Sequence, residues 1–255
     1  MTERTHWLTL RPPFTAAVVA AAAAHARAEA PRESVGLVVG GRYRAVDNVA
    51  DDPAARFEIA PEDYAAALSD GVQAVIHSHP SGPGHPSEAD MRGQIGTAVP
   101  WAIVSGEGLL CIWGDDHAPA LFDAAGRHRA RGFLHGVSDC YTIIRDWWRE
   151  RRGVTLPEIP RQWDWWSKGG DLYLQNFGHA GFRVLSRDPT EFARLARPGD
   201  VALRPVCSPV PNHGGVVCDG GLFLDQRWRM LSVHQPAGRV LPCCSHLLRR
   251  DHDAA

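Results

Sequence analysis

Two histidines and an aspartate lie close together in the chain, with a spacing that suits a metal site. His77 and His79 end an apolar run, and Asp90 follows a loop rich in glycine and proline. In an extended strand, residues i and i+2 point to the same side, so both imidazoles face one point. Two imidazoles and one carboxylate are a ligand set of catalytic zinc that leaves one position open. Because zinc lowers the pKa of a bound water to about 7, the pattern predicts zinc-dependent hydrolysis.

Each of these residues also has an ordinary structural explanation. His77 could be a buried histidine at a strand end, and Ser87 with Asp90 matches a capping box, which stabilises many helix starts. These separate explanations would have to coincide at one spacing, so we favour the metal site.

The spacing His-x-His-x7-Ser-x2-Asp of this segment resembles the signature of the JAMM (MPN-type) metalloproteases in every fixed position. That family also carries a glutamate well upstream, at the start of a strand beside the metal, and Glu33 stands in a similar context. The resemblance implies that Glu33 is the general base and that Ser87 donates a hydrogen bond to the developing oxyanion. The zinc ligands that it implies are His77, His79 and Asp90.

A cysteine and a histidine in the second half of the chain form another candidate site. Cys140 lies at the expected N-terminus of a helix, where exposed N–H groups and the helix dipole favour the thiolate. His213 enters a predicted strand and is the best candidate for the base of a Cys/His pair. Spacing alone leaves open that the thiol is a small buried side chain and the imidazole a surface one.

This part of the chain, about residues 132 to 228, resembles the NlpC family of papain-like cysteine peptidases. The shared features are Asp-Cys at a helix start, Pro-Gly-Asp before a strand, and Asn-His followed by small and apolar residues. That family cuts cell-wall peptides, so the resemblance implies Cys140 as nucleophile, His213 as base and peptidoglycan stem peptides as substrate. The third, orienting residue falls on Asp225 by position, or on Gln226 if the hairpin turn is tight.

Length and composition are consistent with two folded domains or with one large one. The chain has 255 residues, 44% of them hydrophobic, and a net charge of -2. It has no long basic run, so we do not expect a nucleic-acid partner held by phosphate contacts. The six cysteines form no regular framework, which indicates reduced thiols. Four of them are expected to be structural: Cys207, Cys218, Cys243 and Cys244.

The N-terminal region is expected to be an ordinary helix rather than a signal peptide. Residues 15–30 are rich in alanine, follow two prolines and continue into charged residues without losing helical character. No stretch reaches the roughly 20 apolar residues that a membrane span needs. We therefore expect synthesis in the bacterial cytoplasm without a signal peptide, and no membrane span.

Residues 1–118 are expected to alternate helices and strands. Helices are predicted over residues 15–30, 61–70 and 87–98, and strands over residues 34–39, 57–59, 72–77, 101–105 and 109–113. With the resemblance to JAMM proteins, this pattern predicts an α+β or α/β domain with a mixed sheet flanked by helices. Residues 119–131 are expected to be a linker.

Residues 132–255 are expected to form a papain-like α+β domain. Helices are predicted over residues 139–152 and 172–177, and strands over residues 201–206, 213–218 and 222–225, the last two as a hairpin around Asp219-Gly220. Five of the nine tryptophans lie between Trp147 and Trp166, which suggests an aromatic core or an aromatic groove wall.

A JAMM-like domain followed by an NlpC-like domain resembles the phage tail-tip assembly proteins of the lambda K type. The resemblance fades after about residue 228. It implies a tail-associated double peptidase that has tail-tip proteins as partners and opens peptidoglycan locally. Two alternatives remain: a structural tail-tip component in which one or both sites do not turn over, and a host enzyme that cleaves isopeptides or small cysteine conjugates.

Overall fold

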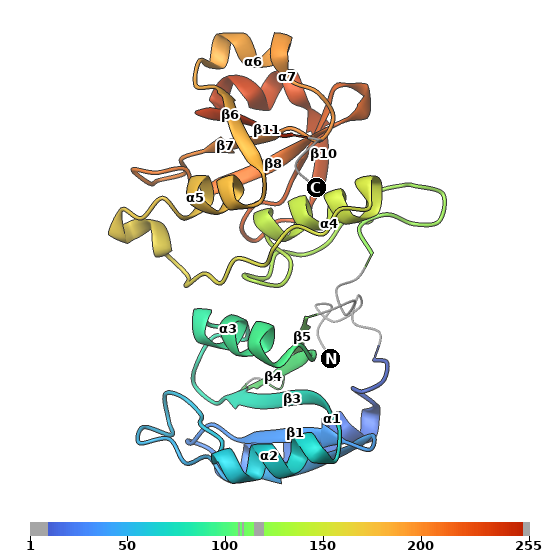
Figure 1. The fold of residues 1–255 in the computed structure, drawn as a ribbon, viewed down its shortest axis with the longest axis vertical. Coiled ribbons are helices and arrows are strands. Elements are labelled where there is room, and N and C mark those ends of the chain that lie inside the picture. Colours follow the sequence, from blue (N-terminus) through green and yellow to red (C-terminus); the bar gives the residue numbers. More distant parts are fainter. Residues whose placement is uncertain (1–9, 107, 109, 115–119, 252–255) are drawn as a thin grey trace. The chain divides into compact units, whose positions relative to one another are not determined.

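The computed structural model describes residues 10–106, 108, 110–114 and 120–251 (Figure 1). The chain divides into two compact units, Met1–Pro119 and Ala120–Ala255. Each unit has its own sheet and its own buried apolar clusters. Within the described residues, no helix is both long and apolar enough to cross a membrane.

The first unit is built on a five-stranded sheet with the strand order β2-β1-β3-β4-β5. β3 and β4 run parallel, whereas the other neighbouring strands are antiparallel. The predicted mixed sheet is therefore confirmed. Its strands are β1 (Val35–Val39), β2 (Arg42–Val46), β3 (Val72–His79), β4 (Trp101–Ser105) and β5 (Leu110–Trp113).

Three helices accompany this sheet: α1 (Ala16–Glu29), α2 (Pro61–Ser69) and α3 (Glu88–Thr97). The Thr15 side chain caps α1, and the helix buries Val18, Ala22 and Ala26, four residues apart, against alternate residues of the sheet. Ile76 of β3 points to this α1 face. His77 therefore points to the opposite face, because side chains alternate along a strand.

Two local predictions for the first unit are wrong. Residues 57–59 do not form a strand, because backbone groups of this segment bond to Asn48: its amide nitrogen donates to the carbonyl of Arg56, and its amide oxygen accepts from the N–H of Glu58. β2 was not predicted from the sequence. It pairs with β1 across Gly40 and Gly41, whose φ angles of 56° and 71° suit a tight hairpin turn.

The second unit is built on a six-stranded sheet with the order β10-β9-β8-β7-β11-β6, and every neighbouring pair is antiparallel. Both faces are buried, since Val216 and Val217 belong to apolar clusters on opposite sides. Strands and helices follow in chain order as α4 (Cys140–Arg152), α5 (Leu172–His179), β6 (Phe182–Ser186), α6 (Pro189–Leu195), β7 (Val201–Arg204), β8 (His213–Cys218), β9 (Leu222–Asp225), β10 (Val233–Pro236), α7 (Ala237–Val240) and β11 (His246–Arg250).

Two segments outside the resemblances are built into the second unit. β11 lies between β7 and β6, with Leu247 and Leu248 at 0% and 1% exposure. Leu121, from the segment expected as a linker, is fully buried, and its N–H donates to the carboxylate of Glu150 on α4. All six cysteines are free thiols, in agreement with the prediction from composition.

Candidate functional sites

His77, His79 and Asp90 come together where β3 ends and α3 begins. The two histidines leave β3 on one face, and Asp90 lies in the first turn of α3. The Nε2 atoms of His77 and His79 are 3.1 Å apart. Asp90 places Oδ1 3.3 Å from His77 Nε2 and Oδ2 3.5 Å from His79 Nε2. All three residues are buried, and among the described residues they form the one cluster of this kind able to hold a metal ion.

The protonation of this cluster favours a cation at its centre. His79 Nδ1 lies 2.7 Å from the carbonyl oxygen of Pro83 and donates to it, which leaves the Nε2 lone pair facing the other ligands. Burial lowers the pKa of His77, so this ring is neutral. Burial raises the pKa of Asp90, but contacts with both imidazoles and Ser87 lower it far more and keep the carboxylate ionised. Two neutral imidazoles and a carboxylate are a donor set that zinc accepts.

A proton competes with a metal ion for the space between these ligands. Burial lowers the pKa of His79, but Asp90, the Pro83 carbonyl and Glu33 outweigh it and raise the pKa. A metal ion bound between these groups would displace that proton, as metal ligands must be deprotonated.

Glu33 lies beside this cluster. In the β1–β3 ladder Val35 is opposite His77, and continuing this antiparallel register places Glu33 opposite His79, on the same face. Asn48 fixes the backbone here by donating to the Glu33 carbonyl at 2.9 Å. Burial raises the pKa of Glu33 to about 7, although His79 partly offsets the effect. A carboxylate with that pKa suits a general base at neutral pH.

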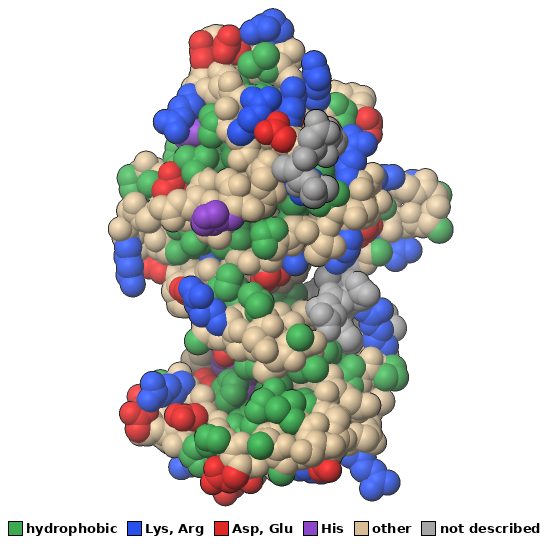
Figure 2. Space-filling model, viewed as in Figure 1, with side chains coloured by type: hydrophobic (Ala, Val, Ile, Leu, Met, Phe, Trp, Pro, Cys, Tyr) green, Lys and Arg blue, Asp and Glu red, His purple; other side chains and the backbone are tan. Residues whose placement is uncertain are grey.

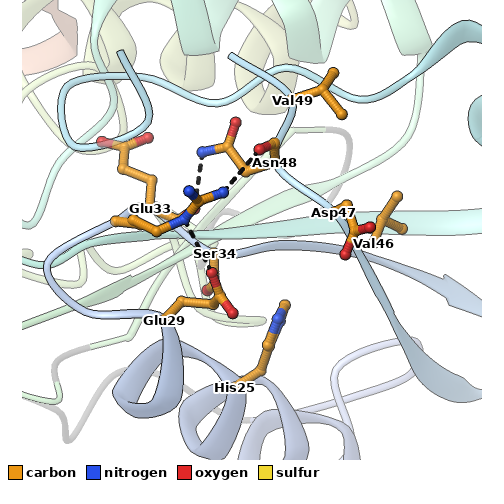
Figure 3. Close-up of a pocket in the computed structure, with 9 residues that line it drawn as sticks. His25, Glu29, Glu33, Ser34, Val46, Asp47, Asn48 and Val49 are labelled. Atoms are coloured by element: carbon orange, nitrogen blue, oxygen red, sulfur yellow. Dashed lines mark hydrogen bonds and ion pairs between the residues drawn. The ribbon is translucent and has the colours of Figure 1, made fainter. Parts of the chain in front are cut away.

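Glu33 also borders a cavity of about 560 Å³ in the first unit (Figure 3). The cavity wall is polar, and Arg32 spans part of it by pairing with Glu29 at 3.3 Å and donating to the Asn48 carbonyl at 3.0 Å. The side chains that line it come from α1, from the segment before β1, from the end of β2 and from the segment after β2: His25, Glu29, Arg32, Glu33, Ser34, Val46, Asp47, Asn48 and Val49.

Ser87 is tied to the metal cluster through Asp90. Its hydroxyl donates to Asp90 Oδ2 at 2.7 Å and accepts from the Asp90 N–H at 3.1 Å, and its own N–H donates to Oδ2 at 2.7 Å. This arrangement is a capping box at the start of α3. The capping explanation therefore applies and is compatible with the metal explanation, since the same contacts that start the helix orient the carboxylate.

Cys140 and His213 meet in the second unit. Cys140 is the first residue of α4 and is 6% exposed, with its N-terminal neighbour Asp139 capping the helix. Its thiol interacts with His213, the first residue of β8. His213 Nε2 bonds to Asp225 Oδ1 at 2.6 Å, which leaves Nδ1 for the sulfur. Burial lowers the pKa of His213, but its bonds to Asp225 and Cys140 outweigh burial and raise it to about 9.

The register of the β8–β9 hairpin brings Asp225, and not Gln226, to His213. Cys218 pairs with Leu222, so three residues connect the strands, and not the two of the tight Asp219-Gly220 turn that was the alternative. The third residue shifts the register by one and turns Asp225 to the face of His213. Gln226 faces away and donates to the carbonyls of Arg131 and Met230, at 3.1 and 2.8 Å.

Sequence reasoning missed three partners of the cysteine site. Tyr173 of α5 places its hydroxyl 3.2 Å from the Cys140 sulfur. Gln235 donates to Asp225 Oδ2 at 2.8 Å. Arg161, 1% exposed, donates to both carboxylate oxygens of Asp139. The only signal in the sequence was the tryptophan density between Trp147 and Trp166, shortly before Tyr173, because contacts between residues this far apart depend on the fold.

Comparisons with known proteins agree with part of this description. Residues 15–115 match the family described as prokaryotic homologs of the JAB domain. The tail tip assembly protein K of Escherichia phage N15 is 33% identical over 224 residues, 84% of this chain and 86% of that protein. Its counterpart from Escherichia phage lambda is 37% identical over 178 residues, 69% and 81% of the two chains. A solution structure from Desulfitobacterium hafniense is 24% identical, with a TM-score of 0.33 over 38% of this chain and 78% of that chain.

Proposed function

Because this chain belongs to the tail tip assembly protein K family and its residues 15–115 match the JAB family, we propose that it is a two-domain peptidase of a phage tail tip. The first unit hydrolyses a peptide or isopeptide bond with zinc, and the second cleaves peptidoglycan stem peptides with a thiol. The convergence of donor atoms from His77, His79 and Asp90 is the observation that carries the proposal. Its partners are tail-tip proteins and its place is the virion tail.

In the first unit, His77, His79 and Asp90 would hold a zinc ion, which when bound would supply a Lewis acid and lower the pKa of a water molecule. Glu33, with a pKa of about 7, accepts the proton of the attacking water and returns it to the leaving amine. Ser87 keeps Asp90 in place through its N–H, so its hydroxyl is able to rotate and donate to the oxyanion of the substrate.

In the second unit, the Cys140 thiolate attacks the carbonyl carbon of a stem-peptide bond. Protonated His213 gives its proton to the leaving amine, and a water then releases the acyl group and restores the thiol. Asp225 holds the ring in the orientation that presents Nδ1 to the sulfur. Burial and the neighbouring Cys140 raise the pKa of Tyr173, so its hydroxyl stays protonated and donates to the thiolate.

Paired substitutions test the proposal in one experiment. Wild type, His77→Ala and Cys140→Ala are each given a fluorogenic isopeptide and purified peptidoglycan. We expect His77→Ala to abolish only the zinc-dependent cleavage and Cys140→Ala to abolish only the release of cell-wall peptides. His85→Ala, in the loop that follows β3, and Cys207→Ala, an exposed thiol, serve as matched controls. Equal digestion of peptidoglycan by wild type and Cys140→Ala would exclude Cys140 as the nucleophile.

A purely structural role is the second candidate, because the names of both relatives describe assembly. Phage carrying His77→Ala and Cys140→Ala together separates the two functions. If the protein is a double peptidase that acts at infection, we expect the phage with both substitutions to form normal tails that do not cleave the cell wall. A wild-type protein that cleaves nothing and is nonetheless required for tail formation would establish the structural role.

A further inference from the structure

We propose that a run of aromatic rings beside Cys140 binds the glycan of peptidoglycan. The inference rests on the proposed cell-wall peptidase function and adds a sugar subsite to it. In peptidoglycan each stem peptide is attached to a sugar, so a peptide that reaches the thiol brings its sugar to the surface around the thiol. That surface carries tryptophans.

The rings form a continuous path. Tyr173, whose hydroxyl contacts the Cys140 sulfur, has its ring centre 5.0 Å from Trp165. Trp165 and Trp166 are 5.8 Å apart. Trp163 continues the path, 5.7 Å from Trp166 and 6.2 Å from Trp228. The neighbouring rings are inclined by 45° to 83°, so edges and faces alternate along the path.

Exposure rises along this path away from the thiol. Tyr173 is 3% exposed, Trp165, Trp166 and Trp163 are half-buried, and Trp228 is 57% exposed. The path therefore begins in solvent and ends at the nucleophile. The exposed end leaves the Trp228 indole available to a ligand.

Buried polar contacts hold both parts of the path to the catalytic elements. Arg161 anchors the tryptophan-rich segment through Asp139, the cap of the helix that presents Cys140. Gln226, which directly follows Asp225, is fully buried and donates to the Met230 carbonyl. This bond shapes the loop that carries Trp228. Arg161 and Gln226 thus tie the tryptophans to the elements that carry the Cys140 site.

The chemistry of these rings matches a glycan. A pyranose ring presents apolar C–H faces that stack on indole, while its hydroxyls stay in water. Cationic side chains flank the path: Arg229 lies over the Trp228 ring, 4.4 Å from its centre, and Arg227 is exposed beside it. Lys168 ends the short helix that carries Trp165 and Trp166. Arginine and lysine complement the carboxylates that stem peptides carry next to the sugar.

Binding of peptide-free glycan strands tests the subsite independently of catalysis. The Cys140→Ala protein is titrated with glycan strands stripped of their peptides, and tryptophan fluorescence and calorimetry report binding. We expect Trp228→Ala in this background to weaken binding about fivefold, the scale of one aromatic contact. Leu231→Ala, a 61% exposed residue of the same loop, is the control and should bind as before. Equal affinity of the Trp228→Ala and Leu231→Ala proteins for the glycan strands would overturn the inference. So would a Cys140→Ala protein that does not bind the glycan strands at all.

Cleavage then separates this inference from the proposed function. In the protein with Cys140 intact, Trp228→Ala should lower kcat/KM about fivefold on whole peptidoglycan and leave free stem peptides unaffected. Glycan binding without any cleavage would remove the peptidase proposal and keep the sugar subsite. Equal losses on both substrates would place Trp228 in the peptide site. A Trp228→Ala protein that binds glycan normally but fails to join tails would show that the surface binds a protein.

Discussion

Both candidate sites use one nitrogen of a histidine to position the other. His79 Nδ1 is fixed by the Pro83 carbonyl, which directs Nε2 to the metal cluster. His213 is held the opposite way, with Nε2 on Asp225 and Nδ1 left for the sulfur. In each candidate site, the partner of one ring nitrogen therefore fixes the direction of the other.

Asp225→Asn should remove the charge that raises the pKa of His213. The pKa of His213 is about 9 in the folded protein and 6.5 as the ordinary value. Its protonation therefore contributes its full stabilisation of the folded state below about pH 6.5, and this contribution is lost as the pH rises through 9. We expect the free energy of unfolding of wild type to fall between pH 7 and 10, and that of Asp225→Asn to fall less. Denaturant unfolding across this range measures the difference, and parallel curves would contradict the assignment.

The same substitution should slow cleavage of cell-wall peptides by about 100-fold or more, because the imidazole loses its orienting carboxylate. Gln226→Asn is the neighbouring control, since Gln226 lies on the other face of the strand and holds a loop. A larger loss of activity in the control would reverse the assignment of the third residue.

At the scale of elements, helix ends and strand register place the reactive groups. Proline, threonine and aspartate at helix starts made α1, α2 and α4 predictable. The choice between Asp225 and Gln226 was not predictable, because one residue in the hairpin connection reverses every side chain of β9. β2 was missed because only Tyr43 and Val46 of its five residues are even partly covered.

Ser87→Ala should affect both a helix and a metal ligand. Loss of the cap at the start of α3 is expected to lower the free energy of unfolding by about 1 kcal/mol. Loss of the hydroxyl contact with Asp90 should also weaken zinc binding about tenfold. Competition with a chelator measures the affinity. The control is Ser69→Ala, which removes an exposed hydroxyl at the end of α2; an equal effect of the two substitutions would contradict the link between cap and ligand.

At the scale of the whole chain, the two units have separate cores, and each core supports one site. Charged side chains of both signs are interspersed over the face shown in Figure 2, in line with a net charge of -2. The second sheet depends on the C-terminal β11, which was not predicted from the sequence because only two of its five residues, Leu247 and Leu248, are apolar.

Leu247→Ala tests the independence of the two units. Leu247 is fully buried in β11, so its truncation is expected to destabilise the second unit by about 2 to 5 kcal/mol. Zinc content should not change, because the cluster lies in the first unit. Leu222→Ala, 36% exposed at the start of β9, is the control. Tryptophan fluorescence during denaturant unfolding measures stability, and loss of zinc from the folded variant would show that the units are coupled.

Metal analysis of the purified protein tests the central claim most directly. We expect about one zinc per chain in wild type and in His85→Ala, and none in His77→Ala or Asp90→Ala, with each variant shown to be folded. A wild-type protein that binds no zinc even when it is supplied, or a His77→Ala variant that keeps it with unchanged affinity, would contradict the account.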